Sequence, residues 1–116
     1  MADYLPKFKP GQTVTFTASA AVEGGQAVEI TGDRRVGPAG AGSTKYTGVA
    51  GHSALAEAKV TVHMPGQVQR IVASGEVAAG DVVQTAAAGK VATGSTAPIG
   101  KALTGGADGD LVEIAD

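Results

Sequence analysis

An internal repeat is the feature that most narrows what this chain can fold into. Three short stretches recur later in the sequence, at offsets of 55 (73 − 18) and 52 (100 − 48): 18–28 with 73–83, 48–50 with 100–102, and 60–62 with 112–114. The repeated units run over about 13–64 and 67–116. A solenoid needs roughly three or more repeats to be stable. Two related β units packed as a small sandwich or barrel are therefore the simpler expectation.

Short alternating segments predict the strands of these units. Residues 13–17, 59–63 and 110–114 each place apolar side chains two positions apart with polar ones between them, as a half-buried strand requires. Gly, Pro, Asp and Ser break the chain between such runs, which is typical of an all-β fold with many turns. In each repeat, a Val-x-x-Gly-x-x-Val segment predicts a turn whose glycine adopts positive φ.

Two segments that connect predicted strands have local signals of their own. Residues 64–67 (MPGQ) predict a tight turn, and we expect it to join strands 59–64 and 67–73 as a hairpin. Residues 53–59 have helix-forming composition, but a helix of about two turns is marginal alone. A short helix and an ordered loop are both open there.

The core is expected to be thin. Ala supplies 22 residues and Gly 18 of the 116, which leaves 28 larger apolar residues. Glycine raises the entropy that is lost on folding. We expect a monomer of modest stability that gains from a partner or an oligomer.

Residues 1–12 stand outside the repeat, and we predict an extended N-terminal arm there, with 13–116 as a single β domain. The arm contains Tyr4 and Phe8, half of the aromatic residues, together with Leu5, Pro6 and Pro10. Two prolines in five residues disfavour a helix and favour an extended path. The arm either docks onto another surface or folds back over its own domain as an edge strand.

Candidate catalytic and ligand-binding groups are few. The chain lacks cysteine and has two histidines, His52 and His63, whereas a zinc site needs three or four ligands. Residues 37–45 contain the ingredients of a phosphate loop in the wrong order, and we interpret them as a flexible surface loop. Asp108 and Asp110 favour a Gly-Asp turn over a calcium site. The pair Arg34-Arg35 marks a hairpin tip or a contact with an acidic partner.

The net charge of −2 provides no basic field for nucleic acid. No uncharged run is apolar enough to span a membrane. We expect no enzyme activity, cofactor, nucleic acid, membrane contact or small-molecule substrate.

The order of these fragments resembles that of the capsid decoration, or cement, proteins of tailed bacteriophages, especially those that infect actinobacteria. The matching fragments are 4–11, 15–20, 24–29, 43–50, 59–62, 73–75 and 79–83. The resemblance implies a small β protein, made in the bacterial host cytoplasm, that binds the outer surface of the virion capsid. It also implies a homotrimer that clamps neighbouring major capsid protein subunits.

We expect the capsid contacts to come from large apolar residues in and next to the arm, because such residues supply much of the binding energy at interfaces. They are Tyr4, Leu5, Pro6, Phe8 and Phe16.

An alternative is a biotinyl or lipoyl carrier domain, since Gly89-Lys90-Val91 follows a Val-x-x-Gly-Asp-x-Val segment. Carrier domains place the modified lysine between neighbours such as Met-Lys-Met or Asp-Lys-Ala. Lys90 matches these poorly, and it would be the modified residue if this alternative were correct.

Overall fold

The computed structural model describes residues 12–116, and its regular structure consists of strands and one short 3-10 turn. The elements in chain order are β1 (Thr13–Ala18), β2 (Ala27–Gly32), β3 (Arg35–Pro38), β4 (Tyr46–Ala50), β5 (Lys59–His63), β6 (Val68–Val72), β7 (Val82–Ala86), η1 (Ala87–Gly89), β8 (Lys90–Thr93), β9 (Pro98–Ala102) and β10 (Leu111–Ala115). The predicted all-β fold of two related units is confirmed, and the three alternating segments are β1, β5 and β10. In this part of the chain, no helix is long and apolar enough to cross a membrane.

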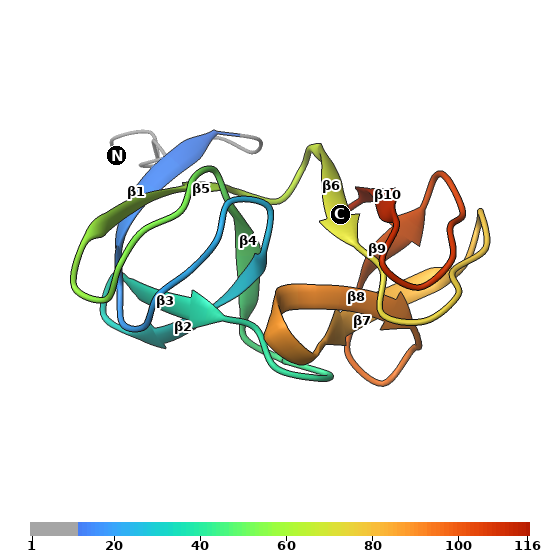
Figure 1. Cartoon of the computed structure of the whole chain (residues 1–116), viewed down its shortest axis with the longest axis horizontal. Helices are drawn as coiled ribbons and strands as arrows, with labels where there is room; N and C mark the ends of the chain where they lie inside the picture. Colours follow the sequence, from blue (N-terminus) through green and yellow to red (C-terminus); the bar gives the residue numbers. More distant parts are fainter. Residues whose placement is uncertain (1–11) are drawn as a thin grey trace, which may run out of the picture.

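The first unit, β1 to β5, is a closed barrel. Its strand order is β1-β3-β2-β4-β5, and β5 pairs back onto β1 to close it. Alternation directs Val14, Phe16 and Ala18 inward, where they join a cluster of buried side chains, while Thr13 and Thr15 face outward. In Figure 1 this unit is coloured from blue to green and lies beside the second unit along the long axis of the molecule.

The second unit, β6 to β10, is a five-stranded sheet with the strand order β6-β10-β9-β7-β8. Strands that neighbour each other in this sheet correspond to strands that neighbour each other in the first unit, with β6 to β10 in the places of β1 to β5. The parallel pairing of Ala18 with Val36 is matched by a parallel bridge between Ala73 and Val91. The predicted turn glycines also match, because Gly25 and Gly80 have φ values of +90° and +89°.

The hairpin predicted around residues 64–67 is wrong. β5 pairs with β1 on one edge and with β4 on the other, so neither edge is left for β6. β6 pairs instead with β10 in the second unit. Residues 64–67 therefore link the two units, and we call them the linker.

In the segment 53–59, residues 53–58 form an ordered loop and not a helix, and Lys59 begins β5, which settles the alternative left open. Ala54 makes an antiparallel bridge with Val22. Glu57 adopts a positive φ of 71°, which a continuous helix does not permit.

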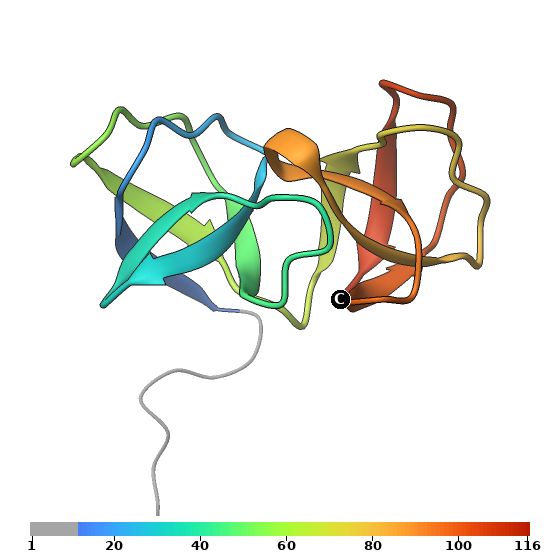
Figure 2. The same ribbon diagram turned by 90° about the horizontal axis from the view of Figure 1, so that it is seen from below.

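The two units share part of their core. The buried cluster of the second unit includes Ala27, Ala39 and Val49 of the first unit. The amide of Gly89 donates a 2.9 Å hydrogen bond to the carbonyl of Ala39. In Figure 2 the orange turn between β7 and β8 lies against the start of β2.

The segment after β3 makes much of this contact. Residues 39–45 are longer by three than the matching residues 94–97, which accounts for the change of offset from 55 to 52. The amide of Gly42 donates to the carbonyl of Thr85, and the amide of Ser43 donates to the Thr85 hydroxyl, both at 2.8 Å. Ala39 is 1% exposed. The prediction of a flexible surface loop over 37–45 is therefore wrong, because this segment docks onto β7.

Candidate partner-binding surface

Backbone pairing fixes the point from which the N-terminal arm starts. The carbonyl of Gln12 accepts a 3.1 Å hydrogen bond from the amide of Met64, where the linker begins. The arm therefore joins the fold beside the junction of the two units. The predicted contact residues of the arm lie outside the described residues, and their role stays a prediction: Tyr4, Leu5, Pro6 and Phe8.

Phe16 lies in the core of the first unit. Its side chain is 5% exposed and packs among the buried residues of that barrel. The guanidinium of Arg34 lies over the ring at 5.6 Å from its centroid. In this conformation Phe16 stabilises the barrel and contributes little surface for a partner. The alternation of β1 predicts this inward position, whereas the expected contact role rested on the aromatic character of Phe16.

A hydrogen-bonded network surrounds the linker. The side chain of Asp116 accepts bonds from the backbone amides of Gly66 and Gln67 at 3.2 and 3.4 Å, and from the Tyr46 hydroxyl at 2.6 Å. Burial, followed by this last bond, raises the pKa of Tyr46 well above its ordinary value. Figure 2 shows the start of β1, the linker and the end of β10 on one side of the molecule. We call the surface formed by Gln12, Tyr46, residues 64–67 and Asp116 the linker face.

A shallow groove of about 300 Å³ adjoins the linker face. Its lining is largely apolar, with one phenol and two hydroxyl side chains: Ser43, Thr44, Tyr46, Pro65, Ala97, Pro98 and Ile99. Both units contribute to it. Such a surface is suited to binding an apolar or proline-containing segment.

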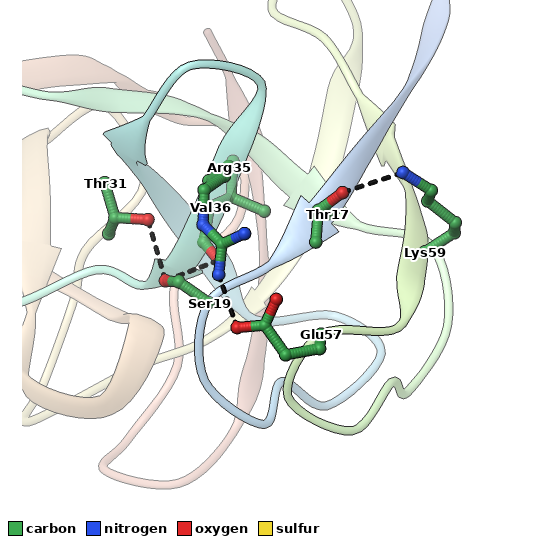
Figure 3. Close-up of polar contacts among 7 residues, drawn as sticks. All are labelled: Thr17, Ser19, Thr31, Arg35, Val36, Glu57 and Lys59. Carbon is green, nitrogen blue, oxygen red and sulfur yellow. Dashed lines mark hydrogen bonds and ion pairs between the residues drawn. The ribbon is translucent and has the colours of Figure 1, made fainter.

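A second polar group of residues covers the seam between β1 and β3. The Ser19 hydroxyl lies 2.7 Å from that of Thr31 and donates to the carbonyl of Val36 at 3.1 Å; both contacts are drawn in Figure 3. Arg35 forms an ion pair with Glu57 on the surface, and this bond lowers the pKa of the Glu57 carboxyl. Exposed pairs of this kind contribute little to stability.

The pair Arg34-Arg35 lies at the hairpin turn between β2 and β3. This is the first of the two predicted alternatives, a hairpin tip. Arg34 adopts a φ of 54° in the turn, and Arg35 begins β3. Their side chains go in different directions, one over Phe16 and the other to Glu57.

The side chains considered as metal-ligating candidates form hydrogen bonds within turns and loops. The Nε2 atom of His52 accepts the amide of Thr61 at 3.2 Å, so its Nδ1 carries the proton and donates to the carbonyl of Ser53 at 3.0 Å. Asp108 and Asp110 accept backbone amides at 2.8 and 3.0 Å, as turn residues do. Within residues 12–116 no three side chains with metal-binding groups come together.

Lys90, the lysine of the carrier alternative, begins β8 directly after η1. Its side chain is exposed. The turn that precedes it packs against the first unit, since the side-chain amide of Gln26 donates to the carbonyl of Ala88 at 3.0 Å. A carrier lysine has to reach separate active sites from a protruding turn. The docked turn therefore gives the carrier alternative no support.

The comparison that decides the family covers both units. The family model described as phage cement protein matches residues 8–115. This chain belongs to the phage cement protein family. The family is a structural one and not a class of enzymes. The resemblance seen in the sequence fragments is thus confirmed at the level of the family, while an actinobacteriophage source stays a prediction.

The fold is also shared with a solved phage structure, the N base of head fiber gp8.5 of bacteriophage phi29. The TM-score is 0.74 at 20% sequence identity, over 89% of this chain and 91% of that chain. At this identity the likeness shows a common fold. No curated protein matches this chain.

Proposed function

We propose that this cement protein binds the outer surface of a phage capsid and stabilises the contacts between major capsid subunits. The observation that carries the proposal is the family match over residues 8–115, which includes every described strand. The protein is then a component of the virion, made in the cytoplasm of the bacterial host. We further propose that it acts as a homotrimer, and that it needs neither nucleic acid nor a small-molecule substrate.

We propose that the linker face is turned toward the capsid. The arm starts there at Gln12, and the groove beside Pro65 lies within reach of the same partner. A chain of eleven residues can span at most roughly 36–40 Å when fully extended. Tyr4, Leu5, Pro6 and Phe8 would supply the contacts of the arm, because aromatic and large apolar residues dominate binding energy.

The network around Asp116 supports this orientation. It holds β4, the linker and the end of β10 together at the linker face. A clamp between capsid subunits has to transmit load without deforming. Hydrogen bonds that join both units next to the binding surface meet this need.

The test is sedimentation of the purified protein with undecorated, expanded capsids. We expect co-sedimentation that saturates at a fixed ratio to the major capsid protein. A variant without residues 2–10 should keep the circular dichroism and urea midpoint of the full chain and lose capsid binding. The matched control is Leu55→Ser, which changes an exposed side chain of another loop and should bind like the full chain.

The two parts of the proposal fail separately. Absence of binding by the full chain would overturn the cement role. Undiminished binding by the truncated variant would overturn the role of the arm alone.

A further inference from the structure

The outer faces of two matched strand pairs can be compared position by position. β1 pairs with β5 as β6 pairs with β10, and residues directly opposite each other share a face of the sheet. In the first unit the outward pairs are Thr13 with His63, Thr15 with Thr61, and Thr17 with Lys59. In the second unit they are Val68 with Ala115, Arg70 with Glu113, and Val72 with Leu111.

The two faces differ most at one end. In the first unit Lys59 donates a 2.9 Å hydrogen bond to the Thr17 hydroxyl, as Figure 3 shows. The second unit has Leu111 beside Val72 at the same positions, and Leu111 is 60% exposed. Since the same backbone carries a polar pair in the first unit, the fold itself does not require apolar side chains here.

Other exposed apolar side chains lie on the second unit. Val68 is 57% exposed, Leu103, directly after β9, is 49% exposed, and Val82 on β7 is 38% exposed. Leu55 is the one large exposed apolar residue of the described chain outside this unit. We call Val68, Val72 and Leu111 the apolar face. A gathered group of this kind marks an interaction site more often than scattered exposed residues do.

The molecule already shows what covers such positions. Val82 corresponds to Ala27 of the first unit (82 − 55), and Lys101 corresponds to Val49 (101 − 52). Ala27 and Val49 lie in the buried cluster of the second unit, at 0% and 5% exposure. Two outward apolar positions of the first unit are thus covered by the second unit.

The apolar face is also continuous with that internal interface. Val72 and Leu111 line a groove of about 320 Å³ together with residues 23–26 and 88–90. The bond from Gln26 to Ala88, which joins the two units, lies in the same groove. A surface that extends an existing contact between two units is suited to a further unit.

We propose that the apolar face is the contact between copies of this chain, so that a second copy covers Val68, Val72 and Leu111. The inference deepens the proposed function, in which the protein is a homotrimer with no assigned contact between its copies. Glu113 and Arg70 lie in the middle of the face on opposite strands. They provide charges of both signs for ion pairs with oppositely charged residues of a second copy.

The first unit supplies the test variant. Val68→Thr, Val72→Thr and Leu111→Lys together place its residues at the matched positions of the second unit, where this backbone is known to accept them. Sedimentation velocity of the full chain, without capsids, should give an oligomer for the wild type and a monomer for the variant. Leu111→Lys alone should weaken self-association by about tenfold or more. The control Leu55→Ser should leave the oligomer unchanged, and the circular dichroism spectra of all variants should agree closely. The urea midpoint of the monomeric variant should fall below that of the wild type, because self-association stabilises the folded state.

Two results would overturn the proposal. They are a wild-type protein that stays monomeric at every concentration, and a folded triple variant that self-associates like the wild type. If that variant also failed to bind capsids, the apolar face would be assigned to the capsid protein. A wild-type oligomer that dissociates in the variant but never binds capsids would support this contact and overturn the proposed function.

Discussion

The hydroxyl of Tyr46 donates a 2.6 Å hydrogen bond to the side-chain carboxylate of Asp116, across 70 positions of the sequence. Tyr46 belongs to the first unit and Asp116 follows the last strand of the second. The same carboxylate holds the linker amides of Gly66 and Gln67. One acidic side chain thus connects the first unit, the linker and the second unit.

Replacing Tyr46 with Phe removes the bond between the units and keeps the ring. We expect the free energy of unfolding to fall by about 1.5–3 kcal/mol, the range for a hydrogen bond to a charged group. Urea unfolding followed by circular dichroism measures this change. In the double variant with Asp116→Asn, the free energy of unfolding should fall by less than the sum of the falls in the two single variants. Strictly additive changes would show that the two side chains do not interact.

Tyr46 should also make stability depend on alkaline pH. Its pKa is raised in the folded protein above the ordinary value of 10.0, chiefly by burial. Below pH 10.0 both states keep the proton, so stability is unaffected. Above it the unfolded chain loses the proton and the folded one does not, so stability falls by up to about 1.4 kcal/mol per pH unit. The decline should be smaller for Tyr46→Phe, and parallel curves for the two proteins would contradict this assignment.

Two matched glycines should resist substitution. A Cβ at Gly48 would overlap the carbonyl oxygen of His63, and one at Gly100 would overlap that of Ala115. We expect Gly48→Ala and Gly100→Ala each to destabilise the fold by about 3 kcal/mol or more. Gly40→Ala is the control, because its Cβ would meet nothing within 4 Å, and it should change stability by about 0.5 kcal/mol or less. Thermal melts of the three variants decide the matter.

The shared core predicts that the units unfold together, as a single domain over 13–116 would. Ile114 is fully buried in the cluster that includes Ala27 and Val49 of the first unit. Ile114→Ala should cost about 2–5 kcal/mol and speed amide hydrogen exchange in both units equally. Unchanged exchange in β1 and β5 would show instead that the first unit is an independent domain.

Phe16 and Phe8 should separate stability from binding. Phe16→Ala removes a buried ring and should cost about 3–5 kcal/mol of stability. Phe8→Ala should leave the urea midpoint unchanged and weaken capsid co-sedimentation. If Phe16→Ala left the stability intact while reducing binding, Phe16 would be a contact residue as the sequence suggested.

The strands could be predicted because alternation reports directly on a strand with one buried face. The pattern in β1 also placed Phe16 inward, and only its aromatic character favoured a contact role. The hairpin at 64–67 could not be excluded from local signals, since its absence depends on β1 and β4 occupying both edges of β5.

The docking of the loop after β3 depends on partners that are distant in sequence. Ser43 bonds to Thr85, 42 positions later. A glycine-rich segment contains no local sign of such a contact. The apolar face likewise became visible only when the strand pairing allowed each residue of one unit to be matched with its counterpart in the other.

Gly89 and Arg34 are counterparts in the two units (89 − 55 = 34), and both have positive φ, 71° and 54°. Gly89 lets its turn approach the first unit closely, because a Cβ there would lie 2.7 Å from the carbonyl oxygen of Ala27. Arg34 has that Cβ, and so it cannot sit against Val82 of another copy in the same way. A head-to-tail contact that repeated around an axis without closing would produce a filament. Arg34 therefore disfavours a filament built by repeating the internal contact from one copy to the next.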